Sequence, residues 1–517
     1  MTRATRNHFW DALPVNTLGE GHPLDLSHLD PATEAQVVAR LLSRDFNAWS
    51  EAASRVGHCA KPIRLRGHSQ TVDARTGEVL STFSSTDQPL GVLHVRCGNR
   101  RASECPSCSR IYAADTFHLI RAGVTGGKGV PEHVADNPLV FATLTAPSFG
   151  PVHGTRNGRK CRPFTMKGQD PTCEHGRKTA CHATHDDGDD LLGQPLCRDC
   201  YDYPGQIVWQ WWAPELWRRF TIDLRRALAK HLGLPESRLA EHVTVQYAKV
   251  AEPQQRGIVH FHALIRLDGP KTDQGFAPAP PGVTAGTLAR VVEQTVTGVS
   301  FDAPPLHDGD PARTLRFGVQ VDARPVTTRR RTDDPGTALA PEQVAGYLAK
   351  YATKSATDSS DADNPHQRRL RATIADLTDR IATDTRTAST PLREHPYGLL
   401  QKWRHMLGFR GHFATKSRRY SVTHGQLRRV RTRYQRLAAA AQREGRTLDV
   451  RDLDDLLSDD AEETTLVIGQ WSFAGSGWDT DGDAELAKAA AARAREYAQW
   501  RAAERRQTTN DRRNREE

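Results

Sequence analysis

The sequence predicts an α+β protein in which a central antiparallel sheet is flanked by helices, with cysteine-rich insertions and a helical C-terminal region. Two stretches rich in apolar and β-branched residues, about 242–251 and 258–267, are separated by a short turn and predict a hairpin. Apolar residues recur with helical spacing over about 214–232 and 341–355. The cysteines gather between Cys59 and Cys200, in polar surroundings that are typical of insertions.

The composition limits the classes of protein to which the chain can belong. It has 517 residues and a formal net charge of +9, which permits an acidic partner such as nucleic acid. No stretch of 18 uncharged apolar residues occurs, so we expect no membrane span and no membrane partner. The first ten residues lack the apolar core of a signal peptide, and we therefore expect a soluble, cytoplasmic protein.

Shifts in composition divide the chain into five expected segments, with further elements inside the third. These are an N-terminal helical segment (1–58), a four-cysteine segment (59–136), a core (137–355) with an insertion at about 156–203, a basic region (356–440), and an acidic linker with a C-terminal helix or tail (441–517). Within the core we also expect strands at 139–145 and 315–326 and a short helix at about 287–297.

Two histidines on the second strand of the hairpin are the first candidate functional residues. Side chains alternate along a strand, so His260 and His262 point to one face and can share a cation, while Phe261 points to the other. Glu252, at the end of the preceding strand, returns beside them and can supply a third ligand. Nitrogen and carboxylate ligands suit Mg²⁺ or Mn²⁺. The alternatives are ordinary strand histidines with a solvated acid, or His153 as the third ligand.

The helix predicted at 341–355 carries the second group of candidates. Tyr347 and Tyr351 lie one turn apart on one face, and each is followed three residues later by a lysine, Lys350 or Lys354. A tyrosine hydroxyl can attack a phosphodiester and retain the phosphate covalently, and a lysine can stabilise the charge. An amphipathic helix with buried tyrosines would show the same spacing.

The cysteines predict one or two structural Zn²⁺ sites. Cys105 and Cys108 form a Cys-x-x-Cys pair that Cys59 and Cys97 can complete. Cys197 and Cys200 form a second pair. Its partners come from a set of six residues, of which we favour the first two: Cys173, Cys181, Cys161, His175, His182 and His185. Free buried thiols are the alternative.

The basic region predicts contact with nucleic acid. Residues 395–443 contain no Asp or Glu, and eleven Lys or Arg lie between Lys402 and Arg436. Backbone phosphates attract such patches. The residues that look best suited to phosphate contact are Arg410, Lys416, Arg418 and Arg419. A solvated basic face is the alternative.

Taken in order, Phe-x-Thr-Leu-Thr (141–145), His-x-His (260–262) and Tyr-x-x-Lys-Tyr (347–351) resemble the three motifs of HUH endonucleases with two tyrosines. More closely, about residues 55–435 resemble the replication initiators of actinobacterial plasmids and integrative elements. Further stretches carry this second resemblance: 59–108, 141–150, 216–221 and 406–413.

This resemblance implies a fold and an activity. The fold would be a five-stranded antiparallel sheet with the histidines on its central strand and the tyrosine helix beside them. The activity would be metal-dependent nicking of one strand at a replication origin, with a covalent 5′-phosphotyrosine intermediate and rejoining, as in rolling-circle replication.

The resemblance also implies partners, and two other functions stay open. Single- and double-stranded origin DNA would be the substrate. The sequence has no Gly-x-x-x-x-Gly-Lys-[Ser/Thr] motif for binding ATP, so we expect no fused helicase. A host helicase would unwind the DNA, and a host polymerase would copy it. A relaxase or transposase can use the same site, although relaxases usually carry the tyrosine before the histidines. A non-enzymatic, zinc-stabilised DNA-binding regulator is the remaining alternative.

Overall fold

The computed structural model describes residues 26–516, except for 157, 165–169, 274, 327–340, 355–363 and 446–464. The chain folds into two compact units. The first unit combines residues from both ends of the chain, within 1–114 and 428–517, and the second spans 115–427. Both contain antiparallel sheets and helices, which confirms the predicted α+β class. In the part of the chain that the structure describes, no helix is long and apolar enough to cross a membrane.

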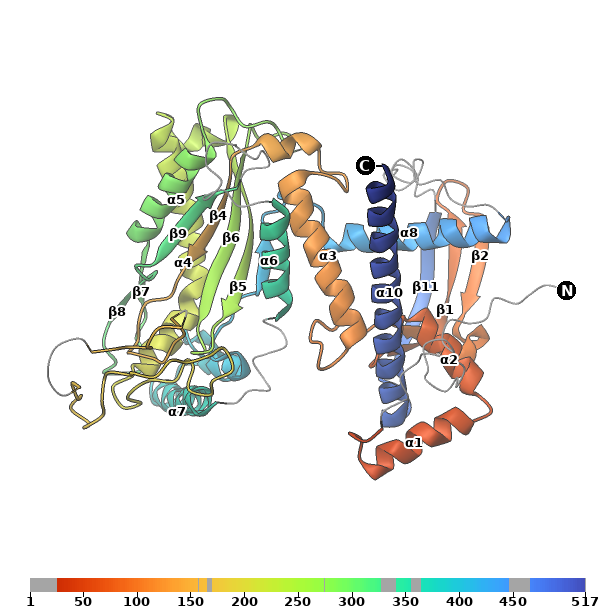
Figure 1. The fold of residues 1–517 in the computed structure, drawn as a ribbon, viewed down its shortest axis with the longest axis horizontal. Coiled ribbons are helices and arrows are strands. Elements are labelled where there is room, and N and C mark those ends of the chain that lie inside the picture. The colour runs from red at the N-terminus through yellow and green to blue at the C-terminus, as the bar shows by residue number, and fades with distance from the viewer. Residues whose placement is uncertain are drawn as a thin grey trace. The chain divides into compact units, whose positions relative to one another are not determined.

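The first unit is held together by a long strand pair that joins the two ends of the chain (Figure 1). β1 pairs with β11 along its whole length, and β2 and β3 also pair with β1. Trp49 and Trp478 pack against each other in the core beneath the helices. The elements are α1 (Pro31–Leu42), α2 (Phe46–Arg55), β1 (Ile63–Asp73), β2 (Val79–Ser84), β3 (Leu93–Val95), β11 (Thr465–Ser476) and α10 (Asp481–Glu516).

Two helices run from one unit into the other. α3 (Pro106–Thr125) begins in the first unit and α8 (His424–Arg443) begins in the second.

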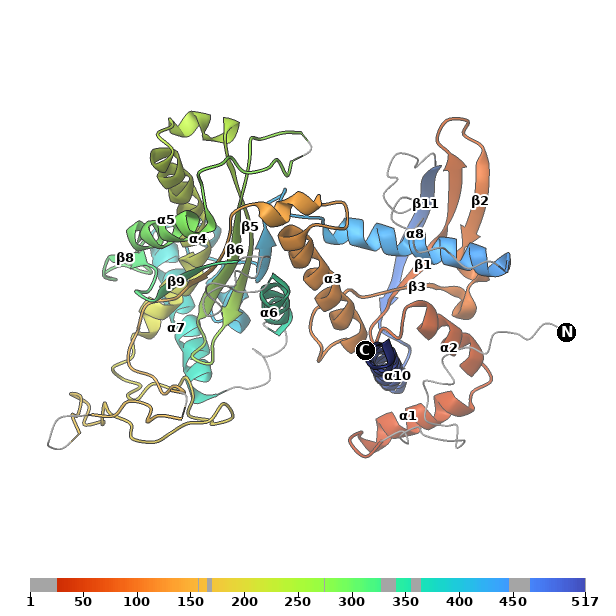
Figure 2. The same cartoon turned by 45° about the horizontal axis from the view of Figure 1, so that its top comes forward.

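The second unit is built on a five-stranded antiparallel sheet with strand order β10-β5-β6-β4-β9, so β6 is the central strand (Figures 1 and 2). Its strands are β4 (Leu139–Leu144), β5 (Thr244–Pro253), β6 (Val259–Asp268), β9 (Val321–Pro325) and β10 (Ala414–Lys416). A separate two-stranded sheet pairs β7 (Ser300–Ala303) with β8 (Arg313–Arg316). The helices are α4 (Tyr203–His231), α5 (Ala285–Gly298), α6 (Pro341–Lys354) and α7 (Pro365–Thr387).

Helices cover both faces of the five-stranded sheet, which explains why β5 and β6 are buried along most of their length. On one face Phe261 and Ile265 join the core formed with α4, α5 and α7. On the other, Val250 and Leu264 pack with α6 and the end of α3. His260 and His262 share this second face, because they alternate with Phe261. The sheet thus places the histidines under α6.

The predicted elements are present, with two differences. α4 begins at Tyr203 rather than near 214, because the Asp202 carboxylate caps the helix at the amide of Gly205, 2.8 Å away. The single strand expected at 315–326 is two strands, β8 and β9, in different sheets. The chain changes sheet between them, where Gly318 donates its amide to the Thr145 carbonyl.

Candidate functional site

The β5–β6 hairpin brings the three candidate metal ligands together. Glu252 on β5 lies directly opposite His260 on β6, and His262 is paired with Val250 one step further along. Residues directly opposite each other on antiparallel strands point to the same face. Glu252 therefore shares a face with both histidines, as the hairpin predicted.

His262 is held in one orientation by three neighbours. Its Nε2 lies 2.6 Å from Glu252 Oε2, and its Nδ1 lies 3.1 Å from Thr143 Oγ1 on β4. The ring of Phe141, also on β4, stacks on the imidazole at 5.9 Å with an angle of 3° between the planes. A hydrogen bond to one ring nitrogen fixes what the other nitrogen can do. Here Nε2 is directed at the carboxylate.

His260 makes its contacts with the turn of the hairpin instead. Its Nδ1 lies 3.0 Å from Gln254 Nε2, and its Nε2 lies 3.4 Å from an Nη of Arg256. Burial, and then the charges of Arg256 and His262, lower the pKa of His260 to about 3, so the ring is neutral at neutral pH. A neutral imidazole is the form that binds a metal ion.

The donor chemistry fits a divalent ion, although the three groups are not fully gathered. Two imidazoles and one carboxylate suit Mn²⁺ or Mg²⁺. Of these three residues, only Glu252 and His262 are in direct contact in this structure. The ligand atoms of all three do not come within 4.8 Å of one another, as those of the cysteine clusters do among the described residues. His153, the alternative third ligand, lies in a cysteine cluster.

The tyrosine helix meets the histidine strand at Tyr347. The ring of Tyr347 stands edge-on to His262, with centroids 5.4 Å apart, and edge-on to Phe141 at 5.7 Å. Its side chain is 39% exposed. Lys350 is exposed on the same helix. The side chains of Tyr351 and Lys354 lie outside the described part of the structure.

The first cysteine cluster contains the four residues grouped from the sequence. Sγ of Cys59 lies 3.8 Å from that of Cys105 and 3.7 Å from that of Cys108, and Cys97 completes the group. Four thiolates about 2.3 Å from one zinc ion would be roughly 3.8 Å apart. A disulfide would need a separation of about 2 Å. These distances are compatible with a structural zinc ion.

The cysteines of the insertion divide into two clusters rather than one. Cys173, Cys197 and Cys200 are together as expected, but their fourth neighbour is His175 and not Cys181. Cys181 instead joins Cys161, and two histidines complete that second cluster, His153 and His185. Three Cys/His clusters compatible with zinc are thus present in the described residues, and they use all nine cysteines.

The predicted DNA-contacting residues fall into two pairs. Arg410 packs over the rings of Trp211 and Trp212, 4.7 and 4.4 Å from their centroids. Lys416 Nζ donates to the Ser421 carbonyl at 2.9 Å, and burial lowers its pKa to about 8. Arg418 and Arg419 line a pocket with other basic side chains.

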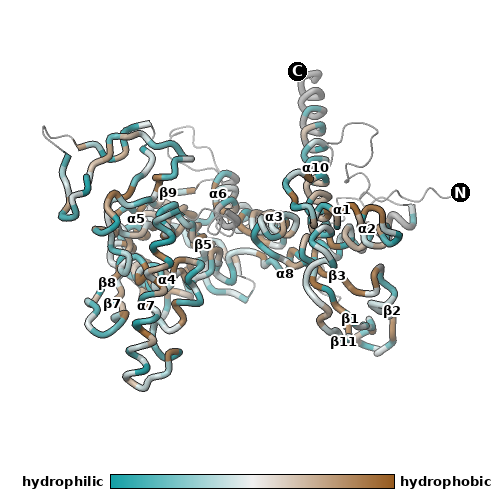
Figure 3. Tube along the Cα trace, turned by 90° about the horizontal axis from the view of Figure 1, so that it is seen from below, coloured by the Kyte–Doolittle hydropathy of each residue, from teal (hydrophilic) through white to brown (hydrophobic). Residues whose placement is uncertain are grey.

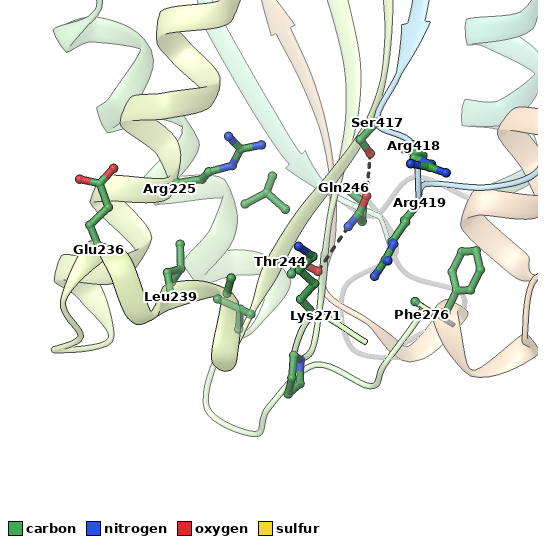
Figure 4. A pocket seen from close by; sticks show the side chains of 15 residues that line it. Arg225, Glu236, Leu239, Thr244, Gln246, Lys271, Phe276, Ser417, Arg418 and Arg419 are labelled. Atoms are coloured by element: carbon green, nitrogen blue, oxygen red, sulfur yellow. Dashed lines mark hydrogen bonds between the residues drawn. The ribbon is translucent and has the colours of Figure 1, made fainter. Parts of the chain in front are cut away.

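This pocket is a basic groove beside the start of β5 (Figure 4), with a volume of about 500 Å³. Four of its lining residues are cationic: Arg225, Lys271, Arg418 and Arg419. Phe276 also lines it, and Gln246 bridges Thr244 and Ser417 by hydrogen bonds. We call this the basic groove. Its charge and its aromatic ring are the two features that nucleic-acid grooves combine.

Sequence reasoning missed the charged residues buried in the sheet. Arg266 on β6 forms a buried ion pair with Asp268 at 2.6 Å. Lys249 on β5 is buried against Phe261 and Trp217, and burial lowers its pKa to about 7. A charged residue inside an otherwise apolar strand is the signal that identifies such positions.

Comparisons with known proteins agree over most of the chain. The family model RepSA, described as "Replication initiator protein, pSAM2", matches residues 45–492. A protein of Streptomyces ambofaciens named "Replication initiator protein" is 39% identical over 470 residues, which are 89% of this chain and 93% of that protein. No solved structure matches the chain.

Proposed function

The chain belongs to the RepSA family of replication initiator proteins of the pSAM2 type, and from this premise we propose that it nicks one strand of origin DNA. The nick would leave the 5′ phosphate on a tyrosine of α6. Rejoining of the strand ends would follow, as rolling-circle replication of a plasmid or integrative element requires. The observation that carries the proposal is the contact between Tyr347 and His262, which unites the tyrosine helix with the histidine strand.

The exposure of Tyr347 favours a chemical role over a packing role. Among the side chains of α6 that the structure describes, Val344, Ala345, Leu348 and Ala349 are buried, and they attach the helix to the sheet. Tyr347 is 39% exposed and contacts the rings of the candidate site. A tyrosine needed only for packing would lie among the apolar neighbours. The exposed part of the Tyr347 side chain is accessible to a substrate.

The reaction exchanges one phosphodiester for another. The phenolic oxygen of Tyr347 or Tyr351 attacks the phosphorus and loses its proton, the bond to the 3′ oxygen breaks, and that oxygen takes up a proton. The phosphotyrosine retains the bond energy, so attack by a 3′ hydroxyl can rejoin strands without ATP. Lys350 and Lys354 would stabilise the negative charge. The second tyrosine would serve a second transfer while the first is occupied.

Glu252, His260 and His262 would hold a catalytic Mg²⁺ or Mn²⁺. Such an ion supplies Lewis-acid polarisation of the phosphate. Thr143 and Phe141 orient His262 for this task. Gln254 and Arg256 hold His260 close to the same place. The residues of β4, β5 and β6 thus hold the ligands, and α6 supplies the nucleophile.

We assign the backbone of the DNA to the basic groove. Arg418 and Arg419 would contact phosphates, with Arg225 and Lys271 beside them, and Phe276 offers a face for a base. Arg410 and Lys416 do not line the groove: Arg410 packs over Trp211 and Trp212, and Lys416 donates to backbone carbonyls. A host helicase and polymerase would extend the nicked strand.

A covalent-adduct assay tests the proposal. The full chain is incubated with labelled single strands covering its own replicon, with Mn²⁺ or with chelator, and adducts are located by peptide mass. We expect a 5′-phosphotyrosine at Tyr347 or Tyr351 that is lost with chelator and in His262→Ala. Tyr434→Phe, an exposed tyrosine on α8, is the control and should leave the adduct unchanged. Tight binding without an adduct on any strand would favour the regulator.

A further inference from the structure

The two cysteine clusters of the insertion are interleaved along the chain. Each cluster takes two pairs of ligands, and the pairs alternate between the clusters. We call them cluster B (His153, Cys161, Cys181, His185) and cluster C (Cys173, His175, Cys197, Cys200). In chain order the pairs belong to B, C, B and C. Because the ligand pairs alternate, each zinc ion would join two segments that enclose a ligand pair of the other cluster. Loss of one ion would therefore leave the loops still joined by the other.

The insertion has little else to hold it in shape. Among its described residues there is no helix or strand, and only isolated bridges such as Arg162 to Cys181 connect its loops. Figure 3 shows these loops largely hydrophilic. A segment with few buried apolar side chains needs metal ions or disulfides to be ordered. Its five cysteines form no disulfide in this structure and lie in clusters compatible with metal ions.

Cluster B has the additional features of a zinc site. His153 Nδ1 and Cys181 Sγ lie 3.1 and 3.4 Å from His185 Nε2. The other ring nitrogen of His185 lies 2.6 Å from Asp189 Oδ2. Zinc-binding histidines usually make this second bond to a carboxylate, which fixes the tautomer and the ring. The Gly154 amide also donates to Cys161 Sγ at 3.3 Å.

The segment that follows cluster B lies against the turn between β5 and β6. His153 exchanges backbone hydrogen bonds with Gly193 and Gln194, each 2.9 Å long. Gly193 has a φ of +77°, and a Cβ placed there would lie 2.5 Å from the backbone nitrogen of Arg256. Only glycine permits so close an approach. His153, a ligand of cluster B, is thus connected to the turn through Gly193, which bonds to His153 and lies against Arg256.

The 253–258 turn also holds His260 in place. Gln254 Nε2 and an Nη of Arg256 lie 3.0 and 3.4 Å from its two ring nitrogens, and Arg256 donates to the carbonyl of Pro147 at 3.4 Å. On the opposite side of the turn, Gln206 and His366 contact the Arg256 carbonyl at 3.2 and 3.1 Å. The turn is therefore clamped between the insertion, α4 and α7.

We propose that the insertion is a cross-braced module of two zinc ions, and that the ion of cluster B positions the 253–258 turn and through it His260. The zinc site itself does not depend on the proposed nicking activity. Its effect on nicking rests on that proposed function. The residues of cluster B are positioning residues, since none of them touches the candidate catalytic site.

Zinc content and hydrogen exchange test the proposal without DNA. We expect three zinc ions per full-length chain by elemental analysis. The His153→Ala/His185→Ala variant should lose one ion, and its amides at 254–258 should exchange at least tenfold faster. Cys59→Ser, in the first unit, should also lose one ion but leave this exchange unchanged. Full zinc content in the double histidine variant would overturn the site, and unchanged exchange after zinc loss would overturn the positioning.

A glycine pair separates positioning from loss of folding. Gly193→Ala should keep all three zinc ions, because it alters no ligand, yet speed exchange in the turn and lower nicking. Gly188→Ala lies in the same module with no atom near its added Cβ, and should change neither. Identical exchange in the two variants would refute the contact. Absence of nicking in the unaltered protein would instead refute the proposed function and leave both other measurements valid.

Discussion

The basic groove permits a quantitative test of DNA binding. Each cation that neutralises a phosphate of a single strand contributes about 0.7 to the slope of log K against log salt concentration. Four cations line the groove: Arg225, Lys271, Arg418 and Arg419. If all four contact phosphates, the groove contributes a slope of about 2.8. Between 50 and 200 mM salt this corresponds to a loss of affinity of roughly 50-fold.

The perturbation is the double variant Arg418→Ala/Arg419→Ala. Removing two phosphate contacts should reduce the slope by about 1.4 and make the salt-dependent loss over this range about sevenfold smaller. Fluorescence anisotropy of a labelled single strand at several salt concentrations measures both quantities. The control is Lys230→Ala/Arg393→Ala, which removes two exposed cations outside the groove and should leave the slope unchanged. Equal slopes for all three proteins would refute the assignment of the groove.

Three further predictions concern buried charge and metal. Asp268→Ala leaves Arg266 buried without its carboxylate partner, and hydrogen exchange should show the second unit destabilised by about 3–5 kcal/mol. The control Asp322→Ala breaks an exposed ion pair and should change the stability of this unit by less than about 1 kcal/mol. Burial lowers the pKa of Lys249 to about 7, from its usual value of 10.5. Between these two pH values the unfolded chain binds more protons than the folded chain, so the stability of the fold rises with pH over this range. Lys249→Met should therefore stabilise the protein most at and below pH 7, and in denaturant titrations the gain should fade by roughly 1.4 kcal/mol for each further pH unit towards pH 10; equal gains at all pH values would contradict this. Cys105→Ser should remove one zinc ion from the chain and raise protease sensitivity of the first unit only; an unchanged zinc content would exclude a metal there.

Local patterns predicted the hairpin and the α6 helix because their signals lie within a few residues. Spacing alone placed Glu252 opposite His260. The pairing of β1 with β11 joins segments roughly 400 residues apart, and no local pattern specifies such a partner. α3 and α7 were also missed. α7 has so many charged residues that its buried stripe, including Leu370, Ile374 and Leu377, is hard to recognise.

The cysteine clusters show a related limit. A Cys-x-x-Cys pair predicts that its two thiolates lie in the same cluster, and this holds for Cys105 with Cys108 and for Cys197 with Cys200. The remaining ligands are brought to each pair by the path of the loops. In an interleaved arrangement the nearest cysteine in sequence is not the nearest in space. Sequence spacing therefore groups Cys181 with Cys173, although the chain carries it to Cys161.

The three sequence motifs acquire a common explanation from their contacts. The first motif supplies Phe141, whose ring covers His262, and Thr143, whose hydroxyl holds the Nδ1 of that histidine. The third motif supplies Tyr347, which touches both of these rings. His262 is thus the residue that each motif contacts, and its Nε2 is left to Glu252. A fixed ring orientation is what a metal ligand requires, so these contacts support the role that we propose for His262.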